Sequence, residues 1–251
     1  MRTLSPTADT AIDIVVAAGT QARAWYDKGA FTVDTKADGS PVSEADRQVE
    51  SALRAALQRS FPADGIVGEE FPETIGTSAV RWVVDPIDGT KQFVRGVPQY
   101  ATLLAREVDG HVDLGVIYLP SLDILMVAEE GRGCWRGDVQ VHVSERDTLE
   151  GAYVLANWLE TWPPDALPTL QAQGALVRTW GDAFGYLMVA SGQAEAVVDC
   201  DAKVYDLGPM PVIMAEAGGV FSALDGNPSH ALGSGIGSNG LLHEAVREIV
   251  R

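Results

Sequence analysis

The sequence predicts an α/β protein with an α+β N-terminal half and an α/β C-terminal half. Apolar residues recur at helical spacing over residues 6–28 and again over residues 43–60. From Tyr100 to Glu129 the period changes to two residues, which is typical of a β-meander joined by short turns. The rest of the chain alternates short apolar runs with helical patterns, as α/β domains do. We therefore divide the 251-residue chain into halves, 1–150 and 151–251.

Local signals predict where these elements begin and end. Ser5 is expected to cap a helix that starts at Pro6 and is ended by Gly29, and residues 43–46, Ser-Glu-Ala-Asp, are expected to begin the second helix. Residues 38–41, Asp-Gly-Ser-Pro, are typical of a turn. Further strands are expected at 66–68, 100–107, 111–119, 122–129, 139–143, 153–156, 176–179, 196–198 and 220–222, a loop at 131–137, and helices at 165–173, 183–191, 207–217 and 241–250.

The composition excludes several classes of partner. The formal net charge is −17, whereas nucleic acids and anionic membranes require a basic surface. No apolar run in the sequence reaches the length of a membrane span. Cys134 and Cys200 form neither a disulfide framework nor a zinc motif, and residues 1–10 lack the pattern of a signal peptide. We therefore expect a cytoplasmic protein that acts on a small molecule.

Residues 85–90, Asp-Pro-Ile-Asp-Gly-Thr, point to a metal-assisted phosphate site. A buried strand is expected to end at Pro86, because proline has no N–H for the ladder. Asp85 and Asp88 would then lie on a tight turn, and Gly89 would open a helix whose free N–H groups can bind an anion. Carboxylates repel phosphate unless a cation lies between them, and hard oxygen ligands favour Mg²⁺. The plain alternative is a solvated turn that caps a helix.

Other acidic residues also follow expected strands or begin expected helices. Glu69 and Glu70 come after a short strand, and Asp206 begins a helix. Taken singly, adjacent acids usually lie in a solvated turn, and an acid at a helix start is usually a cap. The recurrence of such acids in one chain favours a shared site.

Two further patterns are not assigned to this site. The four histidines lack the spacing of a zinc-binding helix, and we expect all of them on the surface: His111, His142, His230 and His243. Residues 233–237, Gly-Ser-Gly-Ile-Gly, match neither the dinucleotide fingerprint nor the P-loop. We interpret this run as a close strand approach before the last helix.

In their order and spacing, the motifs resemble those of the inositol monophosphatase family over nearly the whole chain. They are Asp-Gly-Ser-Pro-Val-Ser-Glu-Ala-Asp at 38–46, Gly-Glu-Glu at 68–70, Asp-Pro-Ile-Asp-Gly-Thr at 85–90, Tyr-Asp at 205–206 and Glu-Ala-Gly-Gly at 216–219. Residues 93–98 with 101–103, 178–186 and 238–243 are similar to the histidinol-phosphatase branch. The chain departs from the family at Tyr205, where tryptophan is usual, and at Pro209 and Pro211, the latter where this branch often has an acid.

The resemblance implies a layered αβαβα sandwich, a homodimer and a metal-dependent phosphomonoesterase. Two to three Mg²⁺ ions per site, or Mn²⁺ in their place, would be bound by five residues, with Asp85 bridging two ions. These implied metal ligands are Glu69, Asp85, the Ile87 carbonyl, Asp88 and Asp206.

The resemblance also implies catalytic and binding roles. Thr90, Asp46 and Glu69 would act on the attacking water, and the backbone N–H groups of Gly89 and Thr90 would hold the phosphate. No covalent phosphoenzyme is expected. The implied contacts to the substrate are Asp88, Gly181, Asp182, Asp199 and Asp206.

The implied reaction is hydrolysis of L-histidinol phosphate in histidine biosynthesis. Inositol-1-phosphate and related sugar or nucleotide phosphates remain alternatives, as does a non-catalytic metal- or anion-binding protein on the same scaffold. A substrate with an ammonium group requires carboxylates beyond the metal ligands, and Asp182 and Asp199 are available. The plain alternative is that Asp182 caps a helix and Asp199 is a surface acid.

Overall fold

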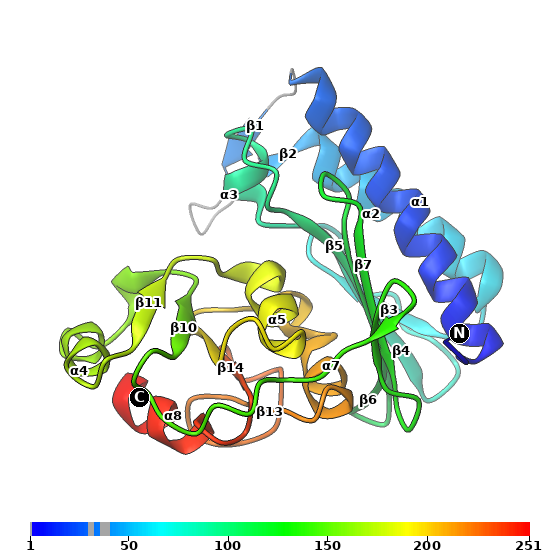
Figure 1. Cartoon of the computed structure of the whole chain (residues 1–251). Helices are drawn as coiled ribbons and strands as arrows, with labels where there is room; N and C mark the ends of the chain where they lie inside the picture. Colours follow the sequence, from blue (N-terminus) through cyan, green and yellow to red (C-terminus); the bar gives the residue numbers. More distant parts are fainter. Residues whose placement is uncertain (1, 30–32, 36–40) are drawn as a thin grey trace.

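The computed structural model describes residues 2–29, 33–35 and 41–251, and it has five layers in the order αβαβα (Figure 1). Helices α1 (Pro6–Lys28) and α2 (Glu44–Ser60) cover one face of a seven-stranded sheet. A central layer of helices separates this sheet from a five-stranded sheet, whose outer face carries the last helical layer. The predicted α/β class and layered sandwich are confirmed. Each sheet comes from one predicted half, and the division itself stays a prediction.

The seven-stranded sheet has the order β3-β4-β5-β6-β7-β8-β9, with β3 parallel to β4 and the other pairs antiparallel. Its strands are β3 (Gly65–Gly68), β4 (Val80–Asp88), β5 (Ala101–Val108), β6 (His111–Leu119), β7 (Ile124–Glu129), β8 (Cys134–Arg136) and β9 (Val139–Gln140). Along β6, Leu114 and Val116 join the core beneath α1 and α2, whereas Ile117 and Leu119 join the central core. This alternation is the period of two residues that the sequence predicts.

Smaller elements complete this half. The helix α3 (Thr90–Phe93) follows β4, and β1 (Val33–Thr35) pairs with β2 (Pro41–Ser43) in a separate antiparallel sheet. Of the turn expected at 38–41, residues 38–40 lie outside the described residues.

The five-stranded sheet has the order β11-β10-β12-β14-β13, parallel across its first three strands and antiparallel after them. Its strands are β10 (Tyr153–Ala156), β11 (Leu176–Arg178), β12 (Ala196–Asp199), β13 (Val220–Ser222) and β14 (Gly235–Ser238). The central helices are α5 (Asp182–Ala190), α6 (Val204–Leu207) and α7 (Met210–Glu216), the outer ones are α4 (Ala166–Ala172) and α8 (His243–Val250), and η1 (Leu159–Thr161) is a 3₁₀ turn. Within the described residues, no helix is long and apolar enough to cross a membrane.

The predicted helix ends of α1 and α2 are confirmed. Ser5 Oγ accepts a hydrogen bond from the Ala8 N–H at 3.1 Å, and Gly29 ends α1 with φ of +61°. Such a left-handed residue at a helix end is usually glycine. Ser43 and Asp46 form a capping box at the start of α2, in which each side chain bonds the other residue's backbone N–H.

Several boundary predictions are wrong. Pro86 does not end β4, which runs on to Asp88 through a shift in its register with β5. The loop expected at 131–137 contains β8, and the strand expected at 139–143 ends at Gln140. The helix expected at 207–217 is two helices, because Pro209 lies between α6 and α7 and cannot donate a helical hydrogen bond.

The glycine-rich run at 233–237 has the structure that the sequence predicts. Its second half forms β14, and a Cβ at Gly235 or Gly237 would lie 2.6–2.8 Å from atoms of Tyr186. The glycines therefore allow this strand to pack directly against the Tyr186 ring.

Two of the four histidines are buried, contrary to the prediction that all lie on the surface. His243 Nε2 lies 2.9 Å from Ser222 Oγ, and His243 Nδ1 lies 2.8 Å from Ser238 Oγ. A buried imidazole is tolerated when both ring nitrogens have partners. His230 is the second buried histidine, and it contacts the opposite half of the chain.

Glu107 connects the two halves through a buried contact with His230. This residue lies on β5, with Arg81 Nη2 at 2.8 Å from Oε2 and His230 Nε2 at 3.5 Å from the same oxygen. His230 belongs to the segment between β13 and β14. The contact with His230 is the largest cause that lowers the pKa of Glu107, and the contact with Arg81 adds to it. Burial acts in the opposite direction, and the resulting pKa is about 2.

Glu107→Gln should lower the free energy of unfolding by about 1–2 kcal/mol at neutral pH, after allowance for solvent around the half-exposed Arg81. Because the folded-state pKa is depressed, the Glu107 carboxylate stabilises the fold above its unfolded pKa of about 4.3. This contribution is lost as the pH falls toward 2. Urea unfolding should show the difference between the two proteins shrinking below about pH 5. An equal difference at neutral and acidic pH would contradict the ionic account.

Candidate active site

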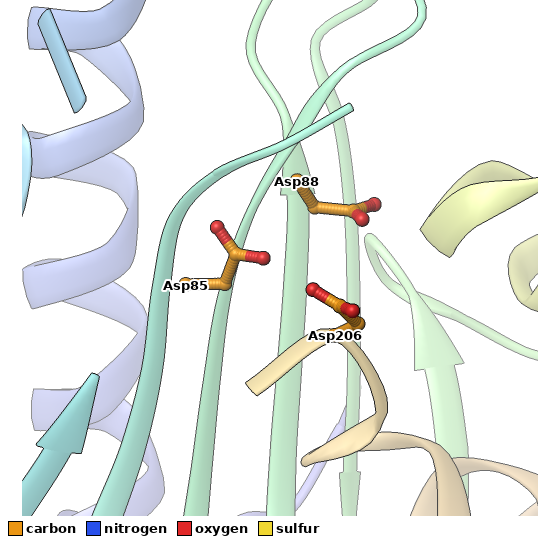
Figure 2. Close-up of side chains that lie close together, drawn as sticks. All are labelled: Asp85, Asp88 and Asp206. Atoms are coloured by element: carbon orange, nitrogen blue, oxygen red, sulfur yellow. The ribbon is translucent and has the colours of Figure 1, made fainter. Parts of the chain in front are cut away.

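A β-bulge places Asp85 and Asp88 on the same side of the sheet. In a regular strand, residues three apart point to opposite faces. Asp85 pairs with Leu103 and Asp88 with Ala101, so three steps along β4 match two steps along β5. The extra residue falls between Asp85 and Asp88, a stretch that includes Pro86, whose missing N–H could not serve a regular ladder. Both carboxylates therefore point toward α6 (Figure 2).

Asp206 reaches the same point from α6. Its Oδ2 accepts a hydrogen bond from the Lys203 N–H at 2.7 Å. At Gly208, a Cβ would lie 3.1 Å from a β4 side chain, so this glycine lets the helix pack closely against the strand. One carboxylate oxygen from each of Asp85, Asp88 and Asp206 lies within 4.8 Å of the other two (Figure 2). The sequence halves thus meet in one group of carboxylates.

Burial and mutual repulsion raise the pKa values of Asp85 and Asp88 well above the ordinary range. Asp85 is 1% exposed and Asp88 is 6% exposed. For Asp85, burial is the largest cause and the charge of Glu69 the next; for Asp88, burial is followed by the charge of Asp182. A cation among these oxygens would offset the repulsion. The donor set is therefore that of a hard divalent metal ion such as Mg²⁺.

Thr90 lies beside this group, where it can relay a hydrogen bond. Its Oγ1 lies 3.3 Å from Asp46 Oδ1 and 3.1 Å from the Ile87 carbonyl oxygen. Gly89 precedes it with φ of +83°, a conformation that glycine adopts readily. The hydroxyl can donate to one acceptor at a time, and its oxygen can still accept from a third molecule. Thr90 can thus link a water molecule to Asp46.

The N-terminus of α2 fixes the orientation of Asp46. The Ser43 N–H and Oγ both donate to Asp46 Oδ2, at 2.7 Å and 2.5 Å. Asp46 is buried. Because Oδ2 is engaged by the cap, Oδ1 is the oxygen that faces Thr90.

A cleft of about 120 Å³ opens beside the carboxylates. It is lined by Glu69, Asp88, Gly89, Thr90, Lys91, Gln92, Asn157, Trp158, Asp182, Asp201 and Asp206. Larger hollows, of about 680 and 530 Å³, lie along α1 and α2 and beside the β5–β6 turn. Neither is lined by any of the three carboxylates, whereas Asp88 and Asp206 line the small cleft, so the side chains rather than the volume identify it as the site. Glu69 lines it, although this residue lies outside the group of three.

Asp182 lies on the wall of the cleft next to Asp88. It begins α5, and the next backbone N–H along the chain donates to Asp88 Oδ2 at 2.8 Å. The preceding Gly181 has no space for a side chain, because a Cβ would lie 2.4 Å from the Asn157 backbone. Burial is the largest cause that raises the pKa of Asp182 to about 6.

Asp199 lies behind this wall. It is 4% exposed at the end of β12, and its Oδ2 accepts from Asn157 Nδ2 at 3.2 Å. Burial, followed by the charge of Asp206, raises the pKa of Asp199 to about 8. The alternative that Asp199 is a surface acid is therefore wrong. So is the alternative that Asp182 caps α5, since Gly181 holds the cap position.

Several cleft residues were missed by the sequence reasoning. Lys91 Nζ lies 3.9 Å from the centre of the Trp158 ring, which is a cation–π contact across the cleft. Gln92 Nε2 donates to Asp182 Oδ2. Asn157 and Trp158 directly follow β10, so their position at a strand end was a usable signal. Lys91, Gln92 and Asp201 carry no signal beyond their closeness to other site residues.

Comparison with known proteins bears on these observations. A family model described as the inositol monophosphatase family matches residues 3–251. A histidinol-phosphatase of Chlorobaculum parvum is 36% identical over 93% of this chain and 92% of its own length. An inositol-1-monophosphatase of Rhizobium meliloti is 31% identical over 87% of this chain and 86% of its own length.

Solved structures agree with the fold. The extragenic suppressor protein suhB of Bartonella henselae superposes with a TM-score of 0.90 at 27% identity and covers 98% of both chains. An IMPase/NADP phosphatase complexed with Mg²⁺ and phosphate superposes with a TM-score of 0.80 at 25% identity, over 87% of this chain and 85% of that one. The predicted family and enzyme class are therefore confirmed: the chain belongs to the inositol monophosphatase family and is a phosphoric monoester hydrolase.

Proposed function

We propose that this chain is a Mg²⁺-dependent phosphatase that hydrolyses L-histidinol phosphate to L-histidinol and phosphate in histidine biosynthesis. The observation that carries the proposal is the group of three carboxylates within 4.8 Å, beside Thr90 and an acidic cleft. The histidinol-phosphatase relative supports the choice of substrate. A homodimer and a cytoplasmic location stay predictions from the sequence.

The proposed metal ligands are hard oxygen atoms of the three clustered carboxylates and of residues beside them. Two to three Mg²⁺ ions would be bound by Glu69, Asp85, the Ile87 carbonyl, Asp88 and Asp206, and Mn²⁺ would fit the same oxygens. When bound, Mg²⁺ makes water more acidic and neutralises the charge of the phosphate group. Burial of Asp85 and Asp88 supports this assignment, because buried carboxylates need a compensating charge.

The chain's own residues would orient the attacking water and the phosphate. A water between Glu69 and Thr90 would donate to Thr90 Oγ1 while Thr90 donates to Asp46 Oδ1 at 3.3 Å. The proton would thus be drawn toward a buried carboxylate held by its cap. The backbone N–H groups of Gly89 and Thr90 would donate to phosphate oxygens.

The organic part of the substrate would lie against Gly181, Asp182 and the ring of Trp158. Histidinol phosphate carries an ammonium and an imidazole, whereas inositol phosphate carries only hydroxyl groups on its ring. Asp182 offers a carboxylate on the cleft wall, beside Asp88 and Asp206. Asp199 lies behind this wall and bonds Asn157, so it would act on the substrate only through that residue. The carboxylate of Asp182 supports a cationic substrate over a neutral sugar.

Asp85→Asn should nearly abolish hydrolysis and remove the stabilisation by Mg²⁺. In the wild type, Mg²⁺ at a hundred times its dissociation constant should raise the free energy of unfolding by about 2.7 kcal/mol, because it binds the folded state alone. The variant loses a proposed metal ligand, so its melting temperature should scarcely change between chelator and excess Mg²⁺. Thermal unfolding with and without Mg²⁺ measures this difference.

Thr90→Ala is the matched control for this test. Its hydroxyl would contact the water rather than the metal, so the rise in melting temperature with Mg²⁺ should persist while hydrolysis slows by about a hundredfold. Normal activity in Asp85→Asn would refute the proposed metal site. If Mg²⁺ no longer raised the melting temperature of Thr90→Ala, the proposal that Thr90 contacts the water and not the metal would be refuted.

Asp182→Asn should lower kcat/KM for histidinol phosphate at least tenfold, whereas Asp199→Asn, behind the cleft wall, should have a smaller effect. A charge-assisted hydrogen bond to an ammonium is typically worth about 1.5–3 kcal/mol. A neutral aryl phosphate makes no such contact, so its kcat/KM should scarcely change. Steady-state phosphate release with both substrates provides the comparison. An equal loss of kcat/KM for both substrates would indicate damage to the metal site. An unchanged kcat/KM for both would make inositol-1-phosphate the better candidate substrate.

A further inference from the structure

The segment that carries Glu69 is the first part of the connection between the parallel strands β3 and β4. Residues 68–74, called the 68–74 hairpin below, turn back along β3, and two backbone hydrogen bonds between Ile66 and Thr74, at 2.9 Å and 2.8 Å, join the segment to that strand. Glu69 therefore projects from a loop and not from a regular strand. A metal ligand on a loop needs support from neighbouring groups if its position is to be held before the metal arrives.

Glu50 of α2 provides the first contact to this 68–74 hairpin. It is 0% exposed, and its Oε2 accepts from the Glu70 N–H at 2.7 Å. That N–H belongs to the same planar peptide unit as the Glu69 carbonyl, so the bond fixes the orientation of the Glu69–Glu70 peptide. A Cβ at Gly68 would lie 2.4 Å from Glu50 Oε1, so the carboxylate is packed directly against the hairpin backbone.

Arg54, one helical turn further along α2, provides the remaining contacts. Its Nε lies 2.8 Å from Glu50 Oε1. Nη2 donates to the Phe71 carbonyl at 3.0 Å, Nη1 donates to Thr74 Oγ1 at 3.2 Å, and the guanidinium lies 5.8 Å from the Phe71 ring. A planar guanidinium can make these bonds together, which a single ammonium cannot.

The two oxygens of Glu50 face the hairpin and Arg54, and the residue lies outside the group of three carboxylates. Asp46, which contacts Thr90, lies four residues before Glu50 and so on the same face of α2. One helix face thus supports both Thr90 and the Glu69 segment.

We infer that Glu50 and Arg54 are positioning residues that hold the 68–74 hairpin, and with it Glu69, in the geometry that binds Mg²⁺. The inference rests on the proposed function, in which Glu69 is a metal ligand. Neither residue touches the cleft, so their effect on the metal runs through the hairpin backbone.

Glu50→Ala removes the acceptor of the Glu70 N–H and should weaken Mg²⁺ binding at least tenfold in the full chain. Calorimetric titration with Mg²⁺ measures the affinity. Hydrogen exchange in Mg²⁺-free buffer should show faster exchange of the amides at 69–74, which is a readout independent of activity. Glu50→Gln keeps an oxygen that can accept from the Glu70 N–H, so it should recover part of the affinity.

Glu195→Ala is the matched control. Like Glu50, Glu195 is buried and accepts a hydrogen bond from a backbone N–H, that of Tyr153, at 2.6 Å. It also lies 3.7 Å from an arginine, Arg146. Unlike Glu50, it belongs to the C-terminal half of the chain. This variant should bind Mg²⁺ like the wild type. If Glu50→Ala fails to fold, Arg54→Lys keeps a positive charge beside Glu50 while losing a hairpin contact, and it should still weaken Mg²⁺ binding several-fold.

Unchanged Mg²⁺ affinity in Glu50→Ala and Arg54→Lys, or an equal loss in Glu195→Ala, would overturn the inference. Failure of the proposed function gives a different result, because Glu69→Gln would then leave the Mg²⁺ affinity unchanged. A loss in Glu69→Gln without any in the Glu50 and Arg54 variants would overturn the positioning role alone.

Discussion

Three carboxylates that repel one another are held together between the seven-stranded sheet and the central layer of helices. Two like charges about 4 Å apart repel by roughly 4 kcal/mol at an effective dielectric constant near 20. This cost is opposed by the rigid elements that carry Asp85, Asp88 and Asp206. The bulge between Asp85 and Asp88 turns these two carboxylates to one side of β4, and the glycine after α6 lets Asp206 approach. The free energy stored in this arrangement is what a divalent cation would relieve.

The layers of the fold bring distant segments to this point. β4 supplies two carboxylates from the first sheet, and α6 supplies the third from the central layer. From the opposite face of the sheet, α2 contributes Asp46 and, through the hairpin, supports Glu69. The cleft itself is lined by both halves, from Gly89 on one side to Asp182 on the other. The position of one half relative to the other therefore sets the geometry of the site, and contacts such as that of Glu107 with His230 help to fix it.

Much of this fold follows from local signals in the sequence. Helix ends such as those at Ser5 and Gly29, and the start of α2 at residues 43–46, depend on neighbouring backbone groups, so they are predicted correctly. Pro86 was misjudged because its fit depends on the register with β5, a long-range property. The burial of His243 was missed for the same kind of reason, since its serine partners lie on β13 and β14, whereas His243 begins α8.

The site divides in the same way. Residues within the motifs, such as Asp85 and Asp88, lie close together in the structure, and Thr90 contacts Asp46 of another motif. Lys91 and Trp158 were not predicted, because their contact joins segments that have no detectable relation in the sequence. Glu50 reads as an ordinary helix residue until its contact with the Glu70 N–H is seen. Motif spacing thus identifies the candidate site residues, but not residues such as Glu50 that hold the neighbouring backbone in position.

Phosphate release from L-histidinol phosphate, as Mg²⁺ is added back to chelator-treated protein, tests the central claim most directly. The same titration with inositol-1-phosphate provides the comparison of substrates. The account predicts no turnover without Mg²⁺, saturation as the metal site fills, and a higher kcat/KM for histidinol phosphate. Full activity in the presence of chelator would contradict the proposal that the three carboxylates hold a metal ion that hydrolysis requires.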